Sequence, residues 1–207
     1  MKSLLLKDFY MTLKYCRAFL LIIIVFLAVS VFGDNNMFFV MYPLIISSVI
    51  TVTLISYDEL SKWNIYCEAL PYTRSQIVSE KYLAAVIVIA ITWVVTILTQ
   101  ILFVRPRLLV SWQQIYMTGV MLLAVGVISP AVILPFIFKF GVSKGRIAYY
   151  FVIGLICIAG TFVSFQTENF NFQLSQQVAV HLLLVVCLLI FAVSWLASIS
   201  IYKKRQL

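Results

Sequence analysis

Residues 82–104 read YLAAVIVIAITWVVTILTQILFV and place 23 uncharged side chains between Lys81 and Arg105. A helix rises about 1.5 Å per residue, so this stretch reaches about 35 Å and covers a hydrocarbon core of about 30 Å. A charged side chain at the centre of a spanning helix costs about 2.5–3.5 kcal/mol on insertion scales, so charges mark the ends of spans. The stretch therefore predicts one membrane-spanning helix.

The rest of the chain repeats this alternation of long uncharged stretches and short charged ones. Hydrophobic residues make up 64% of the chain and charged residues 11%, against about 45–50% and about 25% in soluble domains. This composition excludes a conventional soluble fold and predicts an all-α, polytopic membrane protein with a single transmembrane domain, residues 1–207. The six predicted spans are residues 18–33, 37–57, 82–104, 115–138, 147–165 and 178–202.

The positive charges predict the orientation of the spans. Loops that stay in the cytoplasm retain Lys and Arg. Of the 15 basic residues, 13 fall in four segments: the N-terminus, the second loop (residues 58–81), the fourth loop (residues 139–146) and the C-terminal tail. Both termini are therefore expected in the cytoplasm. The formal net charge of +8 is explained by this bias, so no nucleic acid partner is expected. The two exceptions, Arg105 and Arg107, suggest either lipid headgroup binding or an exit site that attracts anions.

Two segments on the predicted cytoplasmic side have helical spacing. Residues 1–17 predict an interfacial helix with an apolar face, which rests either on the lipid surface or on a partner protein. In the second loop, Leu60, Trp63, Cys67 and Leu70 share a helix face, and Pro71 ends the run. Thr73 and Gln76 then form a capping-box pattern that starts the next helix. An ordinary connecting loop with Trp63 in the headgroup zone is the alternative.

The second loop also resembles the signature loop of small ABC-2-type transporter permeases, the membrane subunits of ATP-driven exporters. In the second loop, the resemblance rests on Asp58–Asn64, Leu70–Arg74 and Ile77–Tyr82. It also rests on the stretch from Pro135 to Arg146, which contains the fourth loop. It covers essentially the whole chain. Among these permeases the chain is similar to the branch that exports phenol-soluble modulins, which are amphipathic peptides. Leu60 and Tyr72 depart from the residues common in the family.

The resemblance implies that residues 58–70 form a coupling helix, which docks on a separate ABC ATP-binding subunit. The residues it assigns to this contact are Asp58, Glu59, Lys62, Trp63, Tyr66, Glu68 and Leu70. It adds a contact from the fourth loop through Lys139, Lys144 and Arg146. It also implies a bacterial plasma membrane location, a second permease copy in a homo- or heterodimer, and a hydrophobic or amphipathic peptide substrate. An apolar substrate path is suggested by Phe162, Phe165, Phe170 and Phe172.

The sequence carries no signature of catalysis by this chain. GxxxxGK[ST] is absent, so ATP and Mg are expected only in the partner subunit, and no catalytic, cofactor-binding or metal-binding residue is expected. The four cysteines, Cys16, Cys67, Cys157 and Cys187, form no CxxC pair and are expected to be buried thiols. His181 is expected to be a structural residue rather than a proton relay. Two other functions remain open: a non-transporting assembly or sensor subunit, and a permease for drugs or other hydrophobic small molecules.

Overall fold

The computed structural model describes residues 2–32, 37–68, 72–145, 147, 150 and 176–204. Within these ranges the chain is helical and contains no strand. The helices are α1 (Lys2–Tyr15), α2 (Arg17–Phe32), α3 (Met37–Leu60), α4 (Trp63–Glu68), α5 (Arg74–Thr99), the π-helix η1 (Gln100–Val104), α6 (Arg105–Leu108), α7 (Trp112–Phe140) and α9 (Gln176–Lys204). The predicted all-α class is confirmed.

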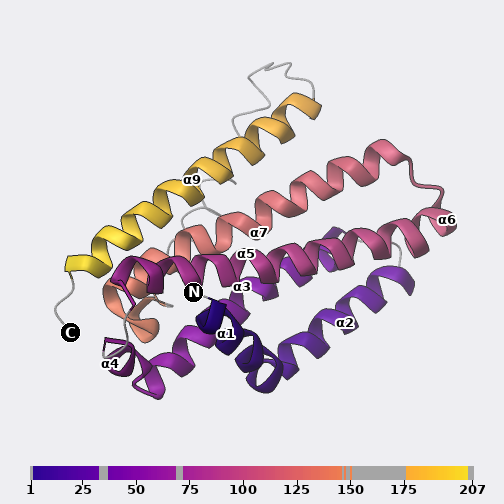
Figure 1. Cartoon of the computed structure of the whole chain (residues 1–207). Helices are drawn as coiled ribbons and strands as arrows, with labels where there is room; N and C mark the ends of the chain where they lie inside the picture. Colours follow the sequence, from indigo (N-terminus) through magenta and orange to yellow (C-terminus); the bar gives the residue numbers. More distant parts are fainter. Residues whose placement is uncertain are drawn as a thin grey trace.

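The long helices α3, α5, α7 and α9 run alongside one another, with α2 at the edge of the bundle (Figure 1). Helix α1 bends away from α2 by 71°. The start of α5, the end of α9 and helices α1 and α4 gather at one end of the molecule (Figure 1), which we call the α4 end. The turn from α6 to α7 lies at the opposite end.

Among the described residues, four helices are long and apolar enough to span a membrane, and the number is five if the bent α1–α2 pair counts as one span. The four are Phe38–Leu60, Arg74–Leu108, Trp112–Phe140 and Val180–Lys204. With 16 residues, α2 measures about 24 Å and is shorter than a typical hydrocarbon core. All but residues 147 and 150 of the predicted span 147–165 lie outside the described residues, so the count of six stays a prediction.

The helix boundaries extend beyond the predicted spans because polar residues cap them. Thr73 accepts from the backbone N–H of Gln76, whose side chain accepts in return from Thr73, so the predicted capping box is confirmed. Ser111 and Gln114 form a second box, and α7 therefore begins at Trp112. Helix α7 therefore begins three residues before the predicted span 115–138, because Ser-x-x-Gln is itself a helix start.

The helix within the predicted coupling segment, residues 58–70, begins later than predicted. Residues 58–60 belong to the end of α3, and the chain turns at Lys62, whose φ is +54°, before α4 begins at Trp63. The left-handed backbone at Lys62 ends one helix axis and starts another. Residues 69–71 lie outside the described residues.

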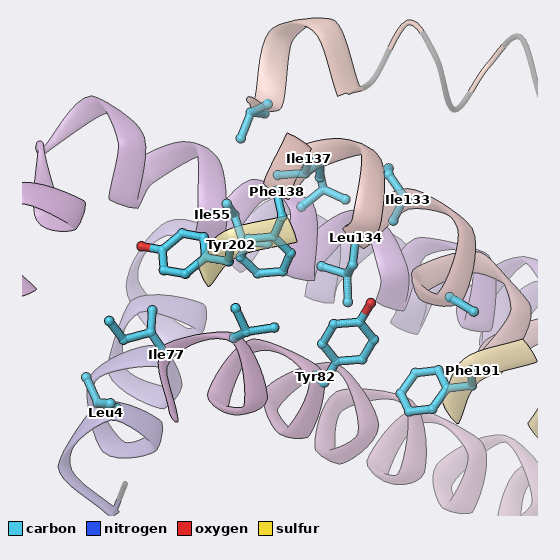
Figure 2. Packing of buried hydrophobic residues seen from close by; sticks show 14 of the residues in the cluster. Leu4, Ile55, Ile77, Tyr82, Ile133, Leu134, Ile137, Phe138, Phe191 and Tyr202 are labelled. Carbon is cyan, nitrogen blue, oxygen red and sulfur yellow. The ribbon is translucent and has the colours of Figure 1, made fainter. Parts of the chain in front are cut away.

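The largest buried cluster lies at the α4 end, where α1, α3, α5, α7 and α9 meet (Figure 2). Its labelled members include Leu4, Ile77, Tyr82, Leu134 and Phe191, one or more from four of these helices. Further along the bundle, Gly126 allows α3, α5 and α7 to approach closely: a Cβ there would lie 2.9 Å from Cγ2 of Ile89 and 3.1 Å from Cδ2 of Leu44. Most of the buried core therefore lies at the α4 end.

Helix α7 continues through Pro130 and Pro135. A proline cannot donate to the carbonyl four residues earlier, which for Pro135 is the carbonyl of Ala131. The Ser194 hydroxyl of α9 donates to that oxygen at 2.6 Å. A neighbouring helix thus satisfies the group that the proline releases, as membrane helices commonly require.

Candidate functional site

Five ionisable side chains form a largely buried ionic cluster at the α4 end. The Lys81 Nζ of α5 lies 2.7 Å from Asp8 Oδ2 of α1 and 2.6 Å from Asp58 Oδ2 of α3. The Lys7 Nζ lies 2.8 Å from Asp58 Oδ1, and Glu80 Oε2 lies 3.4 Å from Lys81 Nζ. Buried charges are tolerated only when they are paired. The cluster therefore ties the ends of three helices together.

Asp8 shows how strongly the cations act. Burial of its carboxyl opposes ionisation, but the attraction of the Lys81 ammonium, assisted by a hydrogen bond with Glu80 and by Lys7, outweighs that cost and leaves the pKa of Asp8 below its usual value. Asp8 is the only acidic residue among residues 1–33, and the other charged residues of its helix are lysines. A single acid in a basic segment could have indicated a buried ion pair, but the sequence analysis did not single out Asp8.

Trp63 connects α4 to this cluster. The Lys7 Nζ lies 4.4 Å from the centroid of the indole ring, a cation–π distance. The Trp63 side chain is half-buried and packs against the core cluster. Its ring also stacks with that of Tyr66, at 6.3 Å between centroids and 18° between planes. Trp63 thus holds α4 on the bundle.

Residues 58–68, which we call the α4 segment, carry exposed side chains on their outer side. Leu60 is 77% exposed and Tyr66 is 70% exposed, and Lys62 is exposed between them in sequence. We call these three residues the α4 surface. Cys67, in contrast, is fully buried against the core, and burial raises the pKa of its thiol. The Glu68 side chain and Leu70 lie outside what the structure describes, so their predicted roles stay predictions.

Glu59 joins the α4 segment to the loop after α7. Its two carboxylate oxygens accept from the backbone N–H of Val142 at 3.2 and 3.1 Å. Gly141 precedes Val142 with a φ of +81° and a ψ of 170°, a conformation that favours glycine. Lys139 and Lys144 are exposed on either side of this contact. The side chain of Arg146, also predicted here, lies outside the described residues.

Hydrogen bonds continue from the ionic cluster into the bundle. The Tyr82 hydroxyl lies 2.8 Å from Ser194 Oγ and 2.7 Å from Ser198 Oγ, and its ring stacks on Trp195 at 5.6 Å between centroids. Tyr82 follows Lys81 directly in α5, while the two serines belong to α9. Displacement of the cluster would therefore reach α9 as well as α5.

The remaining predicted residues separate into those that the structure places and those that it does not. Phe162, Phe165, Phe170, Phe172 and Cys157 lie outside the described residues. Cys16, Cys67 and Cys187 are buried free thiols, as predicted. The Tyr116 hydroxyl lies 2.8 Å from Nε2 of His181, which agrees with a structural role. Among the described residues no group of His, Cys, Asp and Glu could hold a metal ion.

At the opposite end, both arginines have intramolecular contacts. Arg107 donates to the backbone oxygen of Val31 at 2.6 Å, near the end of α2. The guanidinium of Arg105 lies 3.6 Å from the ring centroid of Trp112. Cations near a helix C-terminus stabilise its unpaired carbonyls. Both arginines thus connect helices at this end, while lipid headgroup binding and an anion-attracting exit site stay predictions.

The comparisons identify the family of this chain. No curated protein and no solved structure is significantly similar to it. The model of a family described as ABC-2 family transporter protein matches residues 3–203. Its members are membrane transport subunits rather than catalysts, and the family implies an ABC ATP-binding partner. Because the match includes the ionic cluster, the α4 surface and the long helices, this chain belongs to the ABC-2 family of transporter proteins.

Proposed function

We propose that the chain is the permease half of an ATP-driven exporter, which moves hydrophobic or amphipathic peptides out of a bacterial cell. A second permease copy completes the transport path, because one bundle of helices encloses little space by itself. ATP and Mg bind to the separate ATP-binding subunit. Both termini and the α4 end face the cytoplasm, where that subunit is found.

The observation that carries the proposal is the two-sided character of the α4 segment. Leu60 and Tyr66 are largely exposed, whereas Trp63 and Cys67 attach the same segment to the core. Exposed aromatic and aliphatic side chains with a charged neighbour are typical of a helix that enters a groove on a partner. The α4 surface therefore docks on the ATP-binding subunit, with Lys62 at its rim.

The mechanism follows from the contacts behind this surface. When the ATP-binding subunits close, they move the α4 segment, and its displacement passes through Trp63 and Lys7 to Asp58 and Lys81. Glu59 carries the same displacement to the loop after α7. Packed interiors transmit strain because they deform little, so each bundle rocks as one body.

A double variant tests the docking surface. Leu60→Ala with Tyr66→Ala is expected to reduce co-purification of the ATP-binding subunit, and peptide-stimulated ATP hydrolysis, by at least about tenfold, as loss of interface anchors does. Leu102→Ala with Phe103→Ala is the matched control, because both residues are exposed at the opposite end (62% and 56%). Wild-type co-purification and hydrolysis by the first variant would contradict the proposal.

A second measurement addresses transport itself. Purified permease with its ATP-binding subunit, reconstituted in vesicles, is expected to accumulate a labelled amphipathic peptide when ATP is supplied on the α4 side. The same vesicles with a hydrolysis-deficient ATP-binding subunit serve as the control. A complex that hydrolyses ATP without moving peptides or hydrophobic small molecules would favour a non-transporting sensor or assembly subunit.

A further inference from the structure

An apolar groove of about 500 Å³ opens between α1, α2 and α5. Its walls include Leu5, Phe9 and Leu13 from α1, Leu20 from α2, and Ile87 and Ile91 from α5. Its volume falls in the range of ligand pockets, about 300–1,000 Å³. The groove is separate from the α4 surface, which none of its lining residues belongs to.

The polar groups that line the groove already have partners inside the protein. Thr12 donates to the backbone oxygen of Asp8 at 2.8 Å, and Thr92 donates to the backbone oxygen of Val88 at 2.8 Å. The Asp8 carboxylate is bound by Lys81. The groove therefore offers an occupant apolar side chains and polar groups that are already hydrogen-bonded. An acyl chain can bind there without leaving any of these protein groups unpaired.

The length of the groove matches one leaflet. Its α5 wall runs from Ala84 to Thr92, a rise of about 12 Å, and one leaflet contributes about 15 Å of a 30 Å core. The groove is therefore about as long as the acyl chain of a lipid in one leaflet.

The mouth of the groove carries positive charge. Lys14 and Arg17 are exposed and follow Leu13 of the groove wall. Arg17 Nε donates to the backbone oxygen of Leu13 at 2.9 Å, which holds the guanidinium beside that wall. Asp8, the one acid of α1 and α2, is buried in the ionic cluster. We propose that the groove binds one acyl chain of an anionic phospholipid, with Lys14 and Arg17 at its phosphate headgroup.

Photocrosslinking tests this proposal in the full-length chain. The protein is reconstituted in vesicles of phosphatidylcholine with 20% phosphatidylglycerol carrying a photoreactive acyl chain, about one anionic lipid in five being enough to attract a basic surface. Adducts are expected on residues 5–13 and 84–92, and unlabelled phosphatidylglycerol is expected to compete at least about fivefold better than phosphatidylcholine. Adducts spread evenly over the lipid-facing helices, or equal competition, would overturn the proposal.

Two pairs of variants separate the groove from the general membrane surface. Ile91→Trp fills the groove and is expected to lower the adduct yield severalfold, whereas Val94→Trp, on an exposed part of α5 outside the groove, leaves it unchanged. Lys14→Gln with Arg17→Gln is expected to abolish the preference for phosphatidylglycerol, whereas Lys203→Gln with Lys204→Gln preserves it. Equal effects within either pair would overturn the proposal. Disulfide-linked copies formed through Ile91→Cys would assign the groove to a second copy instead.

Discussion

The Lys81 ammonium lies between two carboxylates from different helices, 2.7 Å from Asp8 and 2.6 Å from Asp58. Lys81 begins the apolar part of α5, Asp8 lies in α1, and Asp58 lies at the end of α3. A single cation therefore links α1, α3 and α5 at the α4 end. The first prediction follows from this arrangement.

Replacement of Lys81 by Met should leave Asp8 and Asp58 buried without their shared cation. Breaking a buried pair by removing one partner costs about 3–5 kcal/mol, so the thermal unfolding midpoint in detergent should fall by several degrees. Lys139→Met, at an exposed lysine, is the control and should change little. Addition of Asp8→Asn and Asp58→Asn to Lys81→Met should recover part of the loss, and no recovery would refute the assignment of the cost to unpaired charge.

The proline of α7 and a serine of α9 give a double-mutant cycle. Ser194→Ala removes the hydrogen bond to the Ala131 carbonyl, which Pro135 leaves without a helical donor; such bonds in membrane proteins average about 0.6 kcal/mol and reach about 1.7. In a Pro135→Ala background the new N–H can donate to Ala131, so Ser194→Ala should cost less. Thermal unfolding of the four proteins measures this coupling, and purely additive effects would disprove it.

Loss of the Glu59 carboxylate should free the loop after α7. Glu59→Ala removes both acceptors for the Val142 N–H, so trypsin should cleave at Lys139 and Lys144 severalfold faster. Glu59→Gln keeps one oxygen acceptor and should show an intermediate rate. Lys62→Gln, on the same segment but without that contact, should cleave as the parent does. Equal rates for Glu59→Ala and the parent would exclude the bridge.

A methyl group at Gly126 should disturb the meeting of α3, α5 and α7. Its Cβ would lie 2.9 Å from Cγ2 of Ile89, and overpacking costs about 1–3 kcal/mol. Gly126→Ala should therefore lower the unfolding midpoint, and Ile89→Ala in the same chain should reduce this penalty. The control substitution, Ala197→Ser, lies on an exposed position of α9 and should change the midpoint little. If Ile89→Ala brings no relief, the close contact is not the cause.

Composition and charge spacing predict the helical class because burial of a charge in hydrocarbon is so costly that the ends of spans become visible in the sequence. Charge spacing alone starts the third span at residue 82, after Lys81. The capping box at Thr73 and Gln76 is the separate signal that starts this helix at Arg74. The pattern also treats Lys81 as a boundary residue on the water side, whereas the structure buries it. The rule that charges mark the ends of spans assumes that each charge is unpaired. It fails for Lys81, which pairs with carboxylates from two distant segments.

The α4 segment illustrates a different limit. Helical spacing groups Leu60, Trp63, Cys67 and Leu70 on one face, but the turn at Lys62 separates Leu60 from the others. Leu60 becomes exposed while Trp63 and Cys67 pack inward. Periodicity assumes one helix axis, and a single residue with a positive φ invalidates that assumption. Helical spacing therefore indicates the segment that we propose to dock, but not which of its side chains are available to a partner.

The separation of Asp8 and Lys81 by 73 residues also constrains biosynthesis. When the ribosome has delivered α1, α2 and α3, Asp8, Asp58 and Lys7 have been synthesised, but Lys81 has not. Until α5 emerges, only Lys7 of the cluster's two cations faces the two carboxylates, and the uncompensated negative charge must remain hydrated because unpaired ions are expelled from hydrocarbon. The amino-terminal segment thus docks late, and the nascent chain closes this end of the bundle only after α5 has been made.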